Sequence, residues 1–89
     1  MPYIPQADRD KFSHPLSILA QTISQYGISG GELNYLMTQV ALMYLYKHKE
    51  SYNTIGDVIK AFECAKLEFA RRKMEPYEDS KKRTNGDVY

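Results

Sequence analysis

The chain has 89 residues, of which 43% are hydrophobic and 26% charged, and its formal net charge is +1. This length allows one domain, and the balanced charge excludes the strongly basic composition of a dedicated nucleic-acid binder. The single cysteine, Cys64, excludes an internal disulfide and a multi-cysteine zinc site. No apolar run could span a membrane and no signal peptide opens the chain, so we expect a cytoplasmic protein.

The first thirteen residues form an expected N-terminal arm. Prolines at the second and fifth positions favour an extended start, which places Tyr3 in an apolar pair on the arm. A first helix is expected over residues 14–26, with Ser13 as its N-cap and Gly27 as a left-handed residue that ends it. Its apolar stripe comprises Leu16, Leu19, Ile23 and Tyr26.

The clearest start signal in the sequence is Ser29 followed three residues later by Glu32, which fits a capping box. A second helix is therefore expected over residues 30–49. Helical projection places apolar side chains on two sides of it. One side comprises Leu33, Leu36, Met37, Val40 and Tyr44, and the other comprises Tyr35, Leu42 and Tyr46, with Gln39 between them. Because a helix that is apolar on two sides is central or shares one side with a partner, we expect a homo-oligomeric helical bundle with Tyr35, Leu42 and Tyr46 at the interface.

A third helix is expected over residues 55–74, with Thr54 as its N-cap and an end before Pro76. Its core stripe comprises Ile55, Val58, Ile59, Phe62, Ala65 and Phe69. Residues 80–89 form a polar tail, and no stretch shows the alternating pattern of a strand. The predicted fold is all-α, a three-helix single domain over residues 1–79 with an extended N-terminal arm and a polar C-terminal tail.

Cations near the end of the third helix are the main candidates for binding an anion. Lys66 falls inside the apolar stripe, where its ammonium needs water, a carboxylate such as Glu63 or Glu32, or an anionic ligand. Arg71 and Arg72 either complement the helix dipole or bind phosphate as bidentate forks. Eight tyrosines supply rings that suit core edges, interfaces or ligand pockets.

Nothing in the sequence indicates catalysis. His14 and His48 do not have the spacing of metal ligands, and no histidine is placed to activate Cys64. Phosphate-binding loops and nucleophile elbows are absent. We therefore expect a non-enzyme without a metal or a cofactor. The basic cluster in the tail lies among acids, so nucleic-acid binding is the least favoured interpretation.

Five short motifs occur in a specific order. They are MPYI at the start, GELNY at 31–35, ECAKLEF at 63–69 with the arginine pair after it, and PYED and NGDVY towards the end. In these motifs the chain resembles a family of small uncharacterised proteins of phages, prophages and their bacterial hosts. Where the family often has a tyrosine before the arginine pair, this chain has Ala70. The resemblance implies a setting of phage–host conflict or phage metabolism, and tails that complete a pocket or an interface.

We expect from these observations a small phage protein that binds an anionic small molecule, in particular a nucleotide-derived immune signal of the host, and sequesters it without cleavage. The candidate ligand-binding residues are Tyr3, Asn34, Tyr35, Lys66, Arg71, Arg72 and Tyr77. The alternative is a helical interaction module that binds a host or phage protein. In that case Tyr35, Leu42 and Tyr46 form a hetero-interface and Lys66 is salt-bridged.

Overall fold

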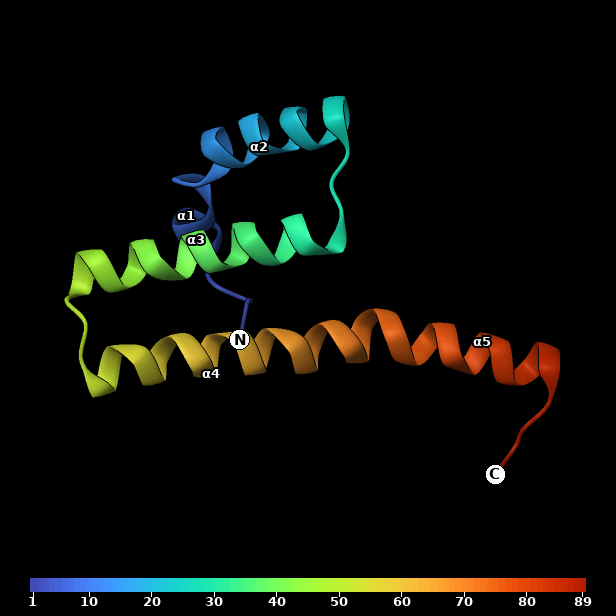
Figure 1. The fold of residues 1–89 in the computed structure, drawn as a ribbon. Helices are drawn as coiled ribbons and strands as arrows, with labels where there is room; N and C mark the ends of the chain where they lie inside the picture. The colour runs from blue at the N-terminus through green and yellow to red at the C-terminus, as the bar shows by residue number, and fades with distance from the viewer.

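The polypeptide is helical along almost its whole length (Figure 1). The computed structural model describes residues 1–89. Its elements in chain order are α1 (Gln6–Asp10), α2 (Ser13–Tyr26), α3 (Gly30–His48), α4 (Tyr52–Phe69), the π-helical segment η1 (Ala70–Met74) and α5 (Glu75–Asn85). No strand is present. The predicted all-α class is confirmed.

The N-terminal arm contains a short helix, α1, which the sequence reasoning did not anticipate. Pro5 occupies the N-cap position, where its carbonyl accepts from the N–H groups of Asp8 at 3.0 Å and Arg9 at 3.2 Å. The fixed φ of proline suits a helix start, so only residues 1–5 of the expected arm precede a helix. Ser13 does not act as the N-cap of α2, because Phe12 occupies that position without a side-chain hydrogen bond.

Both α3 and α4 begin with a serine capping box. As predicted, the Ser29 hydroxyl accepts from the Glu32 N–H at 3.1 Å, and the Glu32 carboxylate accepts from the Ser29 N–H at 2.9 Å. At α4 the same exchange joins Ser51 and Thr54, with hydrogen bonds of 3.1 and 2.8 Å. The predicted N-cap at Thr54 is therefore wrong. Thr54 is the third residue of the helix and returns the hydrogen bond to Ser51.

The last three elements, α4, η1 and α5, form one continuous rod that runs through Pro76 to Asn85 (Figure 1). The expected end before Pro76 is wrong, and so is a tail that begins at residue 80. Pro76 lies in the first turn of α5, where a missing N–H is tolerated. The π turn before it widens the helix, and the Glu75 N–H donates to the carbonyl of Ala70, five residues back. Only the last four residues, which begin with Gly86 at a positive φ of 92°, leave the rod.

The helices pack loosely on one another. α2, α3 and α4 run in alternating directions, and α5 extends past all of them (Figure 1). Among the helices that are connected by loops, only α3 and α4 contact each other at several residues. Tyr44 on α3 donates to Asp57 Oδ2 on α4 at 3.0 Å, and this hydrogen bond raises the pKa of Tyr44. The rod is about 50 Å long at the standard helical rise, and the longest dimension of the molecule is 50 Å.

No residue of the chain is buried. Most members of the predicted core stripes, among them Leu16, Ile59 and Phe69, are exposed, and so are all eight tyrosines. The accessible surface is 8184 Å², whereas a compact monomer of this mass exposes about 5,400 Å². The radius of gyration is 16.8 Å, against about 12 Å for a compact domain of this length. The chain by itself therefore exposes about 2,800 Å² more than a compact domain would.

Candidate functional site

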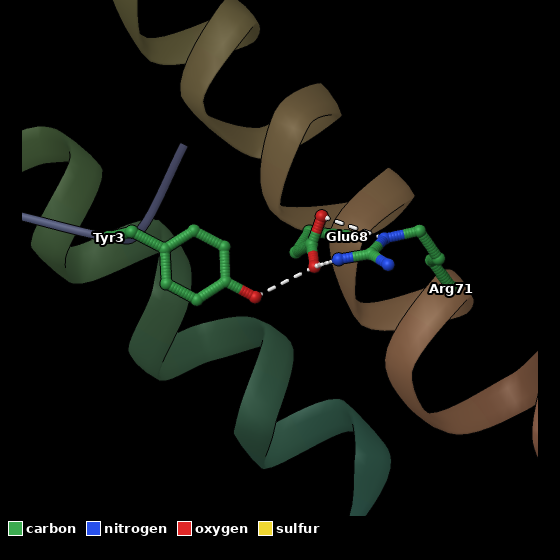
Figure 2. A network of polar contacts seen from close by, with 3 residues as sticks. All are labelled: Tyr3, Glu68 and Arg71. Carbon is green, nitrogen blue, oxygen red and sulfur yellow. Dashed lines mark hydrogen bonds and ion pairs between the residues drawn. The ribbon is translucent and has the colours of Figure 1, made fainter.

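The N-terminal arm lies across α4, where three side chains form one polar network (Figure 2). The hydroxyl of Tyr3 donates to Glu68 Oε1 at 2.7 Å. Arg71 donates from Nη2 to the same oxygen at 2.6 Å and from Nε to Glu68 Oε2 at 3.3 Å. Because Tyr3 and Glu68 are 65 positions apart in the chain, this network attaches the arm to the rod.

The network stabilises the charged form of Glu68. Its carboxylate accepts hydrogen bonds from Arg71 and from Tyr3, and these contacts lower the pKa of Glu68, with Arg71 having the larger effect. The positive charge of Arg72 next to it acts in the same direction. In turn, the hydrogen bond to Glu68 raises the pKa of Arg71. At neutral pH the site therefore holds a carboxylate and at least two guanidinium groups.

A shallow groove of about 310 Å³ lies beside this network. It is lined by Met1, Pro2, Cys64, Leu67, Glu68 and Arg71. The start of the arm forms one wall and α4 with η1 forms the other. Cys64 is a free, half-buried thiol in this groove.

The cations on α4 and η1 differ in how they are paired. The Lys66 side chain is 73% exposed, and its ammonium lies 3.9 Å from Glu63 Oε1. The ammonium therefore reaches both water and Glu63, one of the two carboxylates that the sequence suggested as its partner. Arg71 is paired with Glu68, whereas Arg72 and Lys73 form no ion pair. Within η1, the unpaired Arg72 and Lys73 thus directly follow Arg71, which is paired with Glu68.

The structure joins Tyr3 and Arg71 in one network, and no hydrogen bond or ion pair connects the other candidates to it. Asn34 Oδ1 lies 3.4 Å from the hydroxyl of Thr38 within α3. Tyr77 projects from α5, where the ammonium of Lys81 lies 5.7 Å from the centre of its ring. The candidate ligand-binding residues on α3 and α5 therefore lie outside the network in a single chain.

Glu68 is the member of the network that the sequence reasoning missed. It precedes Arg71 by three positions, and an acid and an arginine at that spacing face each other on a helix. That signal was present in the sequence. The contact with Tyr3 had no comparable signal, because no local spacing relates the arm to α4.

The three candidate interface residues on α3 are all exposed. Tyr35 is 61%, Leu42 is 51% and Tyr46 is 93% exposed. Leu42 and Tyr46 line a second shallow groove of about 480 Å³ together with Leu45, Lys49 and Glu50. This side of α3 is open to contact from another molecule.

No group of histidine, cysteine and acidic residues in the structure is arranged to hold a metal ion. No helix has both the length and the apolar character needed to cross a membrane. The fold and the polar network thus define a small, open, all-helical protein whose N-terminal arm is attached to its longest helix.

The chain belongs to a family described as a domain of unknown function (DUF6899), which matches residues 1–88. The expectation of an uncharacterised family is confirmed by this match. No curated protein and no solved structure shows significant similarity to the chain.

Proposed function

We propose that this protein works as a homo-oligomeric helical bundle that binds and sequesters an anionic, nucleotide-type small molecule without converting it chemically. We further propose that it is a phage protein and that its ligand is an immune signal in the cytoplasm of the bacterial host. The observation that carries the ligand class is the placement of Tyr3 and Arg71 together beside one groove.

Arg71 lines that groove, and Tyr3 is joined to the groove through Glu68; both side chains suit a nucleotide. A tyrosine ring offers a face for stacking a base, and guanidinium groups bind phosphate through charge-assisted hydrogen bonds. Arg71 uses two N–H donors on Glu68, which leaves three of the five donors of its guanidinium. Arg72 and Lys73 add two cations without ion-pair partners. An anionic ligand would therefore find free donors here although Glu68 remains in place.

The assembly part of the proposal is supported by the exposed apolar surface. Two copies that covered the excess of about 2,800 Å² each would bury about 5,600 Å² together, and obligate homodimer interfaces run from about 2,000 to 5,000 Å² or more.

Titration calorimetry against a panel of cyclic and ADP-ribose-derived nucleotides tests the ligand class. We expect at least one member to bind with heat, and we expect Arg72→Gln to weaken its binding at least about tenfold, because loss of a charge-assisted contact costs about 1.5–3 kcal/mol. Arg83→Gln on α5 is the matched control, since Arg83 is also exposed and unpaired. The proposal fails if no nucleotide gives heat. Native mass spectrometry of protein from cells would report stoichiometry and any retained ligand together.

A second candidate is an interaction module that binds a host or phage protein and no small molecule. The observation that favours it is the exposure of Tyr35, Leu42 and Tyr46 on α3, because aromatic and aliphatic side chains commonly form the centres of protein interfaces. A pull-down that yields one stoichiometric partner, combined with silent calorimetry, would favour this candidate.

A further inference from the structure

One side of α3 carries a stripe of side chains that is complementary to itself. Its members recur at intervals of three or four residues, which keeps them on one helix face. They are Glu32, Tyr35, Gln39, Leu42, Tyr46 and Lys49, the last of which directly follows the helix. We refer to these six residues as the α3 stripe. An acid stands at one end of the stripe and a cation at the other, and its four other members are uncharged.

The α3 stripe lies on the open side of the fold. Its three large hydrophobic members are exposed, and Gln39 is half-buried. Tyr44 marks the side that faces α4, because its hydroxyl bonds to Asp57 there. The groove of about 480 Å³ lies along the C-terminal half of the stripe, at Leu42 and Tyr46.

A second copy of α3 fits this stripe in the antiparallel direction. With the axis of symmetry between residues 40 and 41, Tyr35 of one copy lies opposite Tyr46 of the other, and Gln39 lies opposite Leu42. Glu32 then faces Lys49 at both ends of the contact. A parallel pair would instead place Glu32 against Glu32 and Lys49 against Lys49, and like charges in such pairs repel. The pattern therefore favours a two-fold, isologous contact.

The antiparallel arrangement gives partners to the groove at Leu42 and Tyr46 and to Glu32, the acid of the capping box. Tyr35 and Glu32 of one copy would reach the groove of the other, beside Tyr46 and Lys49. Only Oε1 of Glu32 is used in the capping box, so Oε2 remains free for a lysine. The two Gln39 side chains lie either side of the symmetry axis, about 4.5 Å apart along the helix, where a polar pair can fix the register.

We propose that α3 packs antiparallel on α3 of a second copy through the α3 stripe. The proposal rests on the self-association included in the proposed function and names its surface, direction and register. Each chain exposes about 2,800 Å² beyond a compact domain over its whole surface, and the exposed side chains of the α3 stripe are part of that excess. The occupant of the open side of α3 is thus another copy of this chain.

The first test is the mass in solution, measured by sedimentation equilibrium on the full-length chain. Tyr46→Lys should convert the assembly to a smaller species and weaken self-association at least about tenfold, because the substitution places a charge in an apolar contact. Tyr46 is 93% exposed, so the change should do little to the isolated chain. Val40→Lys on the opposite side of α3 is the matched control, since Val40 is 64% exposed. Dissociation by Val40→Lys but not by Tyr46→Lys would overturn the proposal.

The second test fixes the direction and does not depend on ligand binding. In a Cys64→Ser background, proteins with Tyr35→Cys or Tyr46→Cys are refolded together or alone and then oxidised. An antiparallel pair gives a mixed disulfide between positions 35 and 46, and neither protein alone cross-links, because like positions would be about 16.5 Å apart, beyond the limit of about 7 Å. Disulfides between like positions would show a parallel pair, and no disulfide in any sample would exclude the stripe as an interface. If the mixed disulfide forms but no nucleotide gives heat in calorimetry, the proposed ligand class is wrong and the α3 pairing stands.

Discussion

Glu68 is the residue that joins the N-terminal arm to η1 through hydrogen bonds. Its two oxygens accept from Tyr3 and from Arg71, so one carboxylate serves both the arm and η1. Its pKa is lowered in the folded chain, first by Arg71 and then by Tyr3. Protonation of this single group would weaken both hydrogen-bonded contacts at once.

Acidification should therefore release the arm. A group whose pKa is lowered on folding stabilises the fold above its unfolded pKa, which is about 4.3 for glutamate. That contribution is lost as the pH falls through the lower folded value. In an NMR titration we expect the Glu68 carboxyl to titrate below this value and the Tyr3 ring signals to change with the same midpoint. Tyr3 signals that stay constant while Glu68 titrates would contradict this account of the arm.

Removing the Tyr3 hydroxyl should loosen the arm without affecting the helices. Tyr3→Phe keeps the ring and deletes the donor to Glu68, so we expect faster amide hydrogen exchange in α1 and a higher pKa of Glu68. Tyr52→Phe is the control, because Tyr52 is exposed and its hydroxyl forms no hydrogen bond within the chain. Equal exchange in wild type and Tyr3→Phe would mean that the network does not hold the arm.

At this scale the sequence identified two of the three network residues, Tyr3 and Arg71, by chemical type. It did not place them together, because that contact joins the arm to α4 across most of the chain. Lys66 shows the opposite case. Its position within an apolar stripe predicted a demand for a partner, and Glu63 lies close enough to pair with it.

At the scale of elements, local capping chemistry decides where α3 and α4 begin. Ser29 and Ser51 each accept from the third N–H of their helix, and Glu32 and Thr54 return the hydrogen bond. The first pair was predicted because serine followed by glutamate is a strong signal. The second was missed because threonine was assigned the capping position instead of the returning one.

Ser51→Ala should destabilise the fold by about 1 kcal/mol, the usual cost of replacing a capping serine by alanine. The loss follows from the unsatisfied N–H of Thr54 at the start of α4. Urea unfolding measures the change, with Ser80→Ala in α5 as the control, since the hydroxyl of Ser80 forms no hydrogen bond. A Ser51→Ala protein as stable as wild type would show that α4 does not depend on this cap.

The continuous rod could not be predicted from the proline rule. Pro76 normally marks a break because its ring clashes with the carbonyl four residues back and its N–H is missing. Here the π-helical turn of η1 precedes it and alters the hydrogen-bond register. Insertions of this kind depend on a few degrees of backbone rotation at each residue, which composition and periodicity do not encode.

At the scale of the whole molecule, the sequence predicted the fold class and the apolar sides of the helices. It could not show how much of those sides the chain covers by itself. Periodicity reports which residues share a face, whereas coverage depends on the angles and distances between helices. In this chain α3 and α4 pack together, the other helices contribute little, and no residue is buried.

Stability should consequently depend on protein concentration. If the folded chain gains its buried surface from other copies, association stabilises it by mass action. For a dimer, a hundredfold rise in concentration adds about 2.7 kcal/mol, so the midpoint in thermal or urea unfolding should rise with concentration. Circular dichroism over that range measures it. A midpoint that does not move would mean that the open chain is stable alone.

The groove between the arm and α4 contains a thiol whose reactivity can report the position of the arm. Cys64 is the only thiol in the chain, and it lines this groove with Met1 and Pro2. If the arm leaves α4, a maleimide or iodoacetamide should reach the sulfur faster, so we expect the rate of alkylation to rise with the frequency of arm opening. Any ligand or second copy that holds the arm in place should slow the alkylation, and the effect can be followed in a mixture without a mutation.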